Sequence, residues 1–343
     1  KFLNITASNL DEFFMIRVAS LKDMVHAKYT KKDIAGLTPK EQLAIISTGT
    51  HELVEKQYNT YNRSFLPALK HNGLTIVTQY EALNAEQAEY VDRYFMREVY
   101  PVLTPMAVDS SRPFPLIRNK SLNIAALLMD KKRKDTIDFA TVQVPSVLPR
   151  IVTIPSEKEG ETCIILLEQI IEKNIQKLFL NYKVLNATPY RVMRNADLTI
   201  DEDEAADLLI EIERQLKKRQ WGEAIRLEVE QGIDKRLLKI LKKELQIQQE
   251  DIFTIRGPLD LTFLMKVYGF DHLKEEPYPP QPPKGLDMDG DLFEQIRQKD
   301  ILLHHPYETF DPVVNFVRLA AKDPDVLAIK QTLYRVSSNS PII

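Results

Sequence analysis

The chain of 343 residues is longer than one hydrophobic core usually organises, so two or three domains are expected. Hydrophobic residues make up 44% and charged residues 28% of the sequence, close to the average of folded globular proteins, which argues against the disordered and fibrous classes. The 46 basic and 49 acidic residues leave a formal net charge of −3, so the chain as a whole does not attract nucleic acid or any other polyanion. A phosphate site must therefore be local.

The one cysteine of the chain, Cys163, excludes an internal disulfide and suits a reducing compartment, so a cytoplasmic location is predicted. No apolar run approaches the length of about eighteen residues that a membrane-spanning helix needs, and no signal-peptide pattern opens the chain. The sequence begins without an initiator Met and ends at Ile343 directly after a strand-like run. We therefore expect both ends to be cut from a longer protein.

Residues 1–72 are predicted to form a helical domain. Apolar residues recur at three- and four-residue spacing after Ser8, which resembles the first residue of a capping box, so the first helix is expected to begin near Asn9. A second helix is predicted from Thr38, which precedes a proline, to about Phe65. A proline and then an Asn-Gly pair are expected to stop this second helix.

Residues 73–273 are predicted to form an α+β middle domain. A helix is expected from about Ala85 to Val99, and the proline-rich segments that follow it break regular structure. Short β-prone runs and one charged amphipathic segment come next. The predicted strands are Leu122–Met129, Ile151–Ile154, Ile225–Val229 and Ile252–Ile255, and the predicted amphipathic helix is Glu202–Lys217.

Residues 274–285 contain five prolines, which forbid a helix and favour an extended linker. A helix near Phe310–Ala321 and a strand at Val326–Val336 are predicted after it, in the order that starts an α/β layer. One helix and one strand cannot bury a core. Residues 286–343 are therefore expected to be the incomplete beginning of a third domain.

Two residues carry side chains suited to a nucleotide. Asn9 is expected at a helix start, where free backbone amides and the positive end of the dipole attract anions, although simple helix capping explains it without a ligand. Arg335 lies at the end of the last predicted strand, and its guanidinium can clamp phosphate oxygens or simply close the strand at the surface. The chain has ten glycines and no Walker-type loop, so a P-loop or Rossmann protein is not supported.

His26, Lys28 and Asp33 match the H-x-K-x4-D pattern of phospholipase D-like transferases, in which the histidine is the nucleophile and the lysine binds phosphate. That motif needs a rigid strand end, whereas His26 falls at the end of a predicted helix, so a solvated helix end is the preferred interpretation.

The polar and aromatic cluster His304–Phe310 is interpreted as a loop with Thr309 capping the next helix. No ligand set completes a zinc site there.

Five blocks run through the chain in a fixed order: Ser8–Phe14, Tyr100–Asp109, Arg112–Pro115, Leu302–Phe310 and Asp323–Arg335. Together they resemble the first polyphosphate kinase family. The resemblance implies an α+β multidomain protein with a helical N-terminal domain and a middle "head" domain that mediates dimerisation. It also implies C-terminal domains of phospholipase D-like α/β fold, of which this chain holds only the truncated start.

The resemblance further implies reversible transfer of the terminal phosphoryl group of ATP to inorganic polyphosphate through a phosphohistidine, with Mg²⁺ as cofactor. It implies that Asn9 contacts ATP and that Arg335 belongs to a Mg²⁺–phosphate site, where a guanidinium is expected to bind phosphate oxygens because it has no lone pair for the ion. The nucleophilic histidine is expected beyond Ile343. The expected partners are ATP, ADP, polyphosphate and further copies of the chain, as a homodimer or tetramer, without nucleic acid; peripheral association with the inner membrane stays open.

Two other classes stay open. A stand-alone ATP-binding or assembly module would share these features without catalysis. A phospholipase D-like hydrolase that uses His26 would be active as this fragment and would lose activity on His26→Ala. The kinase hypothesis instead predicts that the fragment binds ATP weakly and turns nothing over, because Asn9 and Arg335 alone cannot assemble a phosphate clamp, an ion and a nucleophile.

Overall fold

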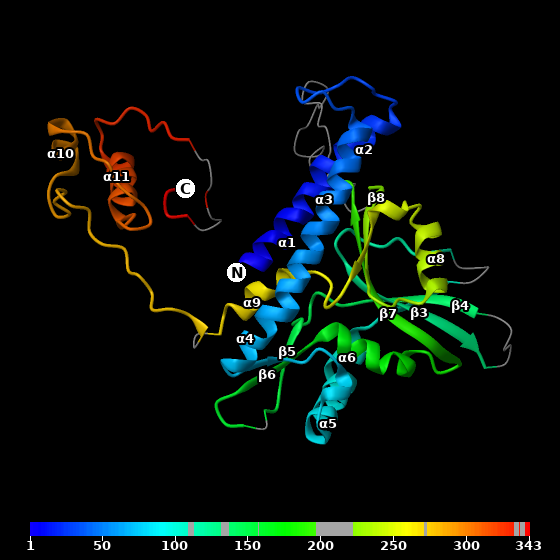
Figure 1. Cartoon of the computed structure of the whole chain (residues 1–343). Helices are drawn as coiled ribbons and strands as arrows, with labels where there is room; N and C mark the ends of the chain where they lie inside the picture. Colours follow the sequence, from blue (N-terminus) through cyan, green and yellow to red (C-terminus); the bar gives the residue numbers. More distant parts are fainter. Residues whose placement is uncertain are drawn as a thin grey trace. The chain divides into compact units, whose positions relative to one another are not determined.

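The computed structural model describes residues 1–108, 113–131, 137–156, 158–196, 222–270, 273–332, 336 and 340–343. The chain divides into two compact units, Lys1–Leu273 and Lys274–Ile343 (Figure 1). The predicted helix Glu202–Lys217 and the predicted phosphate ligand Arg335 lie outside the described residues. Across the described ranges, no helix has the length and apolar character needed to cross a bilayer.

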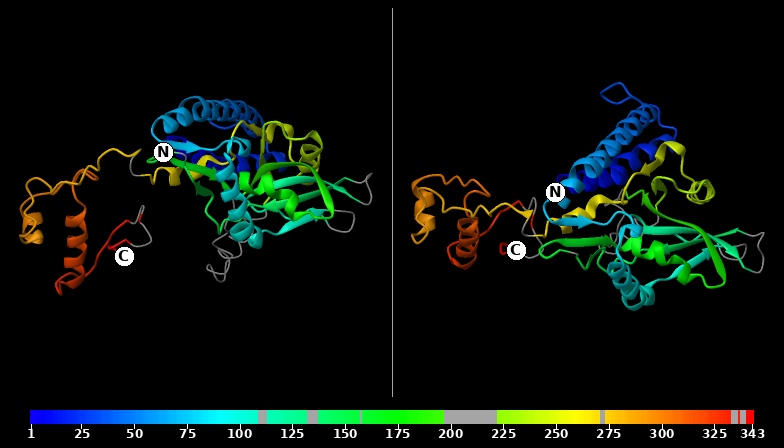
Figure 2. Two further views of the ribbon diagram at one scale, coloured as in Figure 1. Left: turned by 90° about the horizontal axis from the view of Figure 1, so that it is seen from below. Right: turned by 60° about the horizontal axis from the view of Figure 1, so that its bottom comes forward.

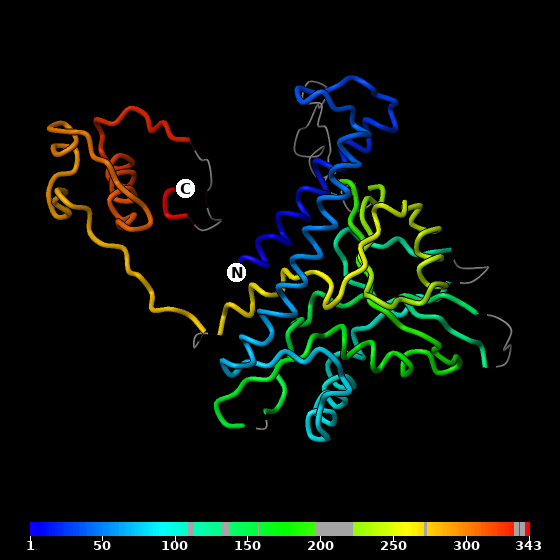
Figure 3. The backbone as a smooth tube through the Cα atoms, in the orientation of Figure 1, coloured from blue at the N-terminus to red at the C-terminus, as the bar shows by residue number. Residues whose placement is uncertain are grey.

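Two antiparallel helical stretches form the N-terminal part of the larger unit (Figure 3). The first runs through α1 (Phe2–Phe13), a π-helical turn (Phe14–Val18) and α2 (Ala19–His26), and the second through α3 (Pro39–Thr60), a π-helical turn (Tyr61–Phe65) and α4 (Leu66–His71). Thr38 caps α3: its hydroxyl accepts from the Glu41 amide at 3.3 Å, and its own amide donates to the Glu41 carboxylate at 2.7 Å. The predicted start of the second helix is therefore confirmed.

The predicted start of the first helix near Asn9 is wrong. The helix α1 already begins at Phe2, so Asn9 lies in its interior. The Ser8 hydroxyl donates to the Ile5 carbonyl at 3.1 Å and caps no helix start. The helix extends this far because the apolar spacing continues back to Leu3, which packs against the core.

The second helix also passes the point where it was expected to end. The π-helical turn Tyr61–Phe65 shifts the hydrogen-bond register just before α4, and Pro67 falls in the first turn of α4, where a backbone amide is not needed. The helix ends at His71. Gly73 follows with φ +77°, a left-handed conformation that glycine adopts without a steric penalty.

Two sheets form the α+β part of the larger unit. The six-stranded sheet has the order β2 (Pro105–Val108), β4 (Ile137–Gln143), β3 (Leu122–Asp130), β7 (Tyr182–Arg194), β8 (Ala224–Glu230), β9 (Ile252–Ile255), and the three-stranded sheet has the order β1 (Leu74–Ile76), β6 (Thr162–Leu166), β5 (Ile151–Ile154). All neighbouring strands are antiparallel except the pairs β8–β9 and β1–β6. The four predicted strands are confirmed as β3, β5, β8 and β9, whereas the central strand β7 was not predicted.

Helices cover both faces of the six-stranded sheet (Figure 2). On β3, Ile124 and Leu128 pack with α5 (Ala85–Tyr94) and α6 (Leu167–Asn174), whereas Leu127 packs with α8 (Lys235–Glu244). This split follows from the alternation of side chains along a strand. The helix α5 and the π-helical turn after it (Phe95–Val99) confirm the helix predicted from Ala85 to Val99.

Besides the apolar clusters on the two faces of the six-stranded sheet, a third hydrophobic cluster joins the N-terminal helices to the sheets. Leu10 and Tyr61 from the helices pack in one cluster with Ile164 of β6 and Phe253 of β9. The helical part is therefore continuous with the α+β part, and α9 (Leu264–Val267) completes the same cluster. The domain limits expected at residues 72 and 285 stay predictions.

The smaller unit contains α10 (Leu292–Gln298) and α11 (Asp311–Lys322), and α11 confirms the helix predicted near Phe310. In the proline-rich segment, the Gln281 amide donates to the Tyr307 carbonyl at 2.8 Å, and the Gln281 carbonyl accepts from the Thr309 amide at 2.9 Å. The predicted cap at Thr309 is wrong: Phe310 is the N-cap residue of α11, and no side chain caps this helix start. The Thr309 hydroxyl instead accepts from the Asp311 amide at 3.3 Å and donates to the Asp311 carboxylate at 2.6 Å, one residue before the cap position.

The strand predicted at Val326–Val336 is not formed in its described residues, 326–332 and 336. A strand needs a neighbour that pairs with its backbone amides and carbonyls. In the described part of this unit, strand-like backbone pairing occurs only at the isolated bridge between Gln281 and Glu308. Among the residues that the structure describes, the apolar run therefore has no strand beside it.

Candidate functional site

Asn9 lies on the solvent-exposed face of α1, among exposed apolar side chains. Four-residue spacing along the helix puts Ile5, Asn9 and Phe13 on one face, and Ile5 and Phe13 keep 37% and 36% of their surface exposed. An amide between two exposed apolar groups suits a planar base, because the amide can pair with the base edge while the apolar groups cover the ring. The attraction of free helix-terminal amides for anions, expected for a helix start, does not act at this interior position.

The opposite face of α1 is held by a buried ion pair. Arg191 of β7 donates to the two carboxylate oxygens of Asp11 at 3.0 and 2.5 Å. It also donates to the Glu228 carboxylate on β8 at 3.1 Å. Burial alone would lower the pKa of Arg191, but Asp260, Asp11 and Glu228 raise it well above its usual value, so the guanidinium stays charged. The ion pair thereby fixes α1 against the sheet and leaves the face that carries Asn9 exposed to solvent.

A second buried guanidinium, Arg226 of β8, lies beside this ion pair. Its Nη2 is 2.8 Å from the Glu228 carboxylate, and the guanidinium lies 4.7 and 4.2 Å from the ring centroids of Phe14 and Phe253. Cation–π contacts of this kind stabilise a charge that has lost its water. The network therefore joins α1, the sheet and the aromatic core.

The residues of the H-x-K-x4-D pattern are not assembled as a catalytic motif. His26 is the last residue of α2, and Lys28 and Asp33 lie in the loop that follows it. Asp33 accepts from the amides of Ala35 and Leu37 at 2.9 and 3.0 Å, so its carboxylate shapes the loop. This geometry gives no support to the hydrolase hypothesis.

Other histidines serve local structure. His305 Nδ1 lies 3.0 Å from the Glu308 carbonyl, and the His304 amide donates to the Glu308 carboxylate at 2.7 Å. His51 stacks on Phe253 with ring centroids 4.0 Å apart. Within the described ranges, one group of side chains lies close enough together to hold a metal ion. It consists of Asp23, His26 and Glu223, whose ligand atoms all lie within 4.8 Å of one another. Because Mg²⁺ prefers oxygen ligands, this set does not fit the expected cofactor, and the Mg²⁺–phosphate role of Arg335 stays a prediction.

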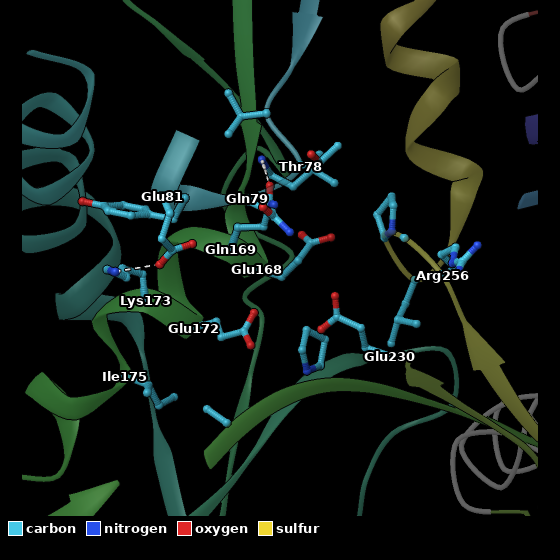
Figure 4. Close-up of a pocket in the computed structure, with 18 of the residues that line it drawn as sticks. Thr78, Gln79, Glu81, Glu168, Gln169, Glu172, Lys173, Ile175, Glu230 and Arg256 are labelled. Carbon is cyan, nitrogen blue, oxygen red and sulfur yellow. Dashed lines mark hydrogen bonds and ion pairs between the residues drawn. The ribbon is translucent and has the colours of Figure 1, made fainter. Parts of the chain in front are cut away.

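A cavity of about 780 Å³ lies within the larger unit, with walls from α4, α6, β1 and the ends of β7 and β8 (Figure 4). Its charged lining residues are four glutamates, one lysine and one arginine: Glu81, Glu168, Glu172, Glu230, Lys173 and Arg256. Two of the glutamates are neutralised. Lys173 Nζ donates to Glu81 at 2.8 Å, and the Arg150 guanidinium, outside the lining, donates to Glu168 at 2.6 Å.

The other two glutamates, Glu172 and Glu230, have no side-chain hydrogen bond or ion pair in the part of the chain that the structure describes. Burial, and then the charge of Glu230, raises the pKa of Glu172 to about 8. Burial and the charge of Glu168 raise the pKa of Glu230. The cavity offers phosphate groups few free cations, because Lys173 is already paired with Glu81, so it is not a candidate for the ATP or polyphosphate site.

Sequence reasoning missed both the cavity carboxylates and the buried network. Glu168 and Glu172 stand one turn apart beside the apolar pair Ile170-Ile171, and like charges at this spacing disfavour a helix, which is a signal that could have been noticed. Arg191 carries no comparable local signal. Its partner Asp11 lies 180 positions away in the sequence.

Profiles of three successive domains match this chain in order. The polyphosphate kinase N-terminal domain matches residues 1–77, the polyphosphate kinase middle domain residues 86–267, and the polyphosphate kinase C-terminal domain 1 residues 291–343. The middle-domain match alone covers more than half of the chain. The chain belongs to the polyphosphate kinase family.

Individual relatives agree with this assignment. The polyphosphate kinases of Halalkalibacterium halodurans and Bacillus anthracis are 49% and 50% identical to the chain over its full length, which corresponds to 49% and 50% of those proteins. The crystal structure of polyphosphate kinase from Porphyromonas gingivalis matches 99% of the chain and 48% of its own with a TM-score of 0.80 and 27% identity. The chain thus spans about half the length of these relatives. The family resemblance and the α+β multidomain fold class predicted from the sequence are confirmed.

Proposed function

We propose that the complete protein transfers the terminal phosphoryl group of ATP reversibly to inorganic polyphosphate through a phosphohistidine, with Mg²⁺, and that this histidine lies outside residues 1–343. The observation that carries the proposal is the ordered match to three polyphosphate kinase domains, together with identities of 49% and 50% along the whole chain. The described histidines discussed above support the second part, because their contacts serve the local fold. Covalent transfer through histidine divides one difficult phosphoryl transfer into two easier steps.

Within this proposal, the chain supplies a nucleotide contact through α1. Asn9 is exposed between Ile5 and Phe13, and the Asp11–Arg191 pair fixes the helix behind it. Arg335 binds phosphate oxygens beside Mg²⁺. The proposal includes a cytoplasmic homo-oligomer with ATP, ADP and polyphosphate as substrates.

Replacing Asn9 with alanine in the complete protein is expected to raise the KM for ATP about tenfold, the loss of roughly one hydrogen bond to the base. The KM for polyphosphate and kcat are expected to stay within about twofold, because Asn9 does not reach the reacting phosphate in this proposal. Steady-state kinetics with varied ATP measures the effect. Ser8→Ala is the matched control, since Ser8 is the exposed neighbour whose hydroxyl donates to the Ile5 carbonyl of its own helix. An unchanged KM for ATP would remove Asn9 from the nucleotide site.

Labelling tests the covalent step. The complete protein, incubated with Mg²⁺ and ATP that carries a labelled γ-phosphate, is expected to retain label that is lost in acid and survives in base, as a phosphohistidine does. His26→Ala is expected to retain the same amount of label, because the proposal places the nucleophile elsewhere. Loss of label in the His26 variant would favour the phospholipase D-like hydrolase hypothesis. A protein that binds ATP and acquires no label would favour the non-catalytic binding module.

A further inference from the structure

We propose that three exposed lysines on the outer face of α8, Lys235, Lys239 and Lys243, form a docking surface for long polyphosphate chains. These residues are called the lysine row below. The inference rests on the proposed function, which makes polyphosphate the product, and it deepens that function by naming where the polymer is held outside the reacting centre. It uses no residue of α1, the helix that carries Asn9.

The charges of α8 are nearly all of one sign. Five of its ten residues are basic and one, Glu244, is acidic. The whole chain carries a formal net charge of −3, so this concentration of positive charge is local. Charges of one sign gathered on a surface raise the local concentration of ligands of the opposite sign.

Helical spacing places the lysine row on the side of α8 that faces solvent. Leu237 and Leu241 are buried against the six-stranded sheet, whereas the three lysines are exposed. The lysines follow one another at four-residue spacing, so they form a line of about 12 Å along the helix. A linear polyanion that lies along this line meets one ammonium group at each turn.

Neighbouring charges on this face repel one another. Like charges three or four positions apart destabilise a helix. Lys239 alone has four basic neighbours at these spacings: Lys235, Arg236, Lys242 and Lys243. Solvent-exposed helices commonly alternate acidic and basic residues, which gives attraction at the same positions. A polyanion bound along α8 converts this repulsion into attraction, so the face has more to gain from a ligand than an ordinary solvated helix has.

The lysine row is available to a ligand. Within the part of the chain that the structure describes, Lys235 and Lys239 form no hydrogen bond or ion pair through their side chains. Lys243 lies 3.5 Å from Glu244 with 82% of its side chain exposed, and an exposed pair of this kind contributes little. Arg236 differs from these three, because the Asp234 carboxylate holds it at 2.7 Å.

The residue types of α8 select polyphosphate among the polyanions. A lysine ammonium group binds phosphate as a point charge, without the fixed fork of an arginine, which suits a flexible polymer of identical units. The helix has no aromatic side chain on which a nucleobase could stack. Its apolar face packs on the sheet, so that face does not enter a lipid surface.

The test is the binding of end-labelled long polyphosphate to the complete protein, followed by fluorescence anisotropy over a range of salt concentrations. Lys235→Gln/Lys239→Gln/Lys243→Gln is expected to bind the polymer at least about tenfold more weakly at low salt. Its affinity is also expected to depend less steeply on salt concentration, because fewer counterions are released. The KM for ATP is expected to stay within about twofold, since the row is not part of the nucleotide contact.

The matched control removes the same total charge from three separate exposed positions. Lys31→Gln/Lys70→Gln/Lys158→Gln is expected to bind the polymer as the unmodified protein does. Equal binding by the two triple variants would show that only net charge matters and would overturn the inference. The inference is also overturned if a single-stranded oligonucleotide with the same number of phosphates binds as tightly as polyphosphate and loses the same affinity in the lysine-row variant.

Polymer synthesis from ATP and Mg²⁺, measured in the same samples, separates the two proposals. If the unmodified protein makes polymer while both triple variants bind it equally, the inference fails and the proposed function stands. If the unmodified protein makes no polymer, the proposed function fails and the inference fails with it.

Discussion

Replacing Arg191 with alanine is expected to lower the free energy of unfolding by about 3–5 kcal/mol, the usual cost of removing one partner from a buried ion pair. Arg191 is 2% exposed and joins Asp11 of α1 to Glu228 of β8. Its removal leaves both carboxylates buried beside an empty space. Thermal and urea unfolding of the complete protein measure the loss, and the first transition to shift should be that of the unit containing α1 and the sheet.

Arg93→Ala is the control for this prediction. Arg93 is exposed and forms a single ion pair with Glu89 at 3.4 Å, so its removal is expected to change the free energy of unfolding by no more than about 0.5 kcal/mol. The replacement Asp11→Asn keeps the side-chain shape and should fall between the two. If Arg191→Ala and Arg93→Ala proved equally mild, the buried network would have no role in holding α1.

Glu172→Gln is expected to raise the free energy of unfolding at alkaline pH, whereas Arg191→Ala lowers it. Folding raises the pKa of Glu172 from 4.5 to about 8, because burial and the nearby charge of Glu230 disfavour the carboxylate. The folded state therefore holds a proton that the unfolded state has lost, and stability falls as pH rises from about 4.5 to about 8. The glutamine amide of the variant is neutral at every pH, so the variant does not lose this stability. With each pKa unit worth about 1.4 kcal/mol, and some solvent access at the cavity, the expected gain at pH 8 is about 2–4 kcal/mol.

The pH dependence distinguishes this effect from better packing. Below pH 4 the carboxyl group is protonated in both states, so the gain from Glu172→Gln is expected to vanish there. Unfolding measured between pH 4 and pH 8.5 gives the whole curve. Glu52→Gln, on the exposed side of α3, is expected to show no comparable dependence. If Glu172→Gln raised the free energy of unfolding by the same amount at all pH values, folding would not raise the pKa of Glu172.

Sequence patterns identified the elements whose signals are local. Thr38 and the proline after it define a helix start through contacts within four residues. The short runs Ile151–Ile154 and Ile252–Ile255 match β5 and β9 because they consist of β-branched and aromatic residues, which favour strands. The order of the five sequence blocks led to the correct family. These features need no information about distant parts of the chain.

The strand β7 could not be found in this way. It contains Asn186, Pro189 and two arginines, residues that are uncommon in central strands. Its formation depends on pairing with β3 and β8 on either side and on the buried acids that neutralise Arg191. The misplaced helix start near Asn9 has a related cause: Ser8 has the right chemistry for a cap, but the apolar contact of Leu3 with the core extends the helix past it.

The candidate sites were predictable only in part. Asn9 was singled out through the family resemblance, and the structure adds its exposed apolar neighbours. The cavity brings Glu172 and Glu230 together from a helix and a strand that are separated by 58 positions in the sequence, so no spacing rule reveals it. Tertiary packing alone creates that pair.

The most direct test of the central proposal is the length of polyphosphate formed by the complete protein from ATP and Mg²⁺, followed by gel electrophoresis with ADP measured in parallel. The account predicts that the polymer grows with time, that one ADP appears for each phosphate added, and that excess ADP reverses the reaction. Release of free phosphate from ATP without any growth of the polymer would contradict it.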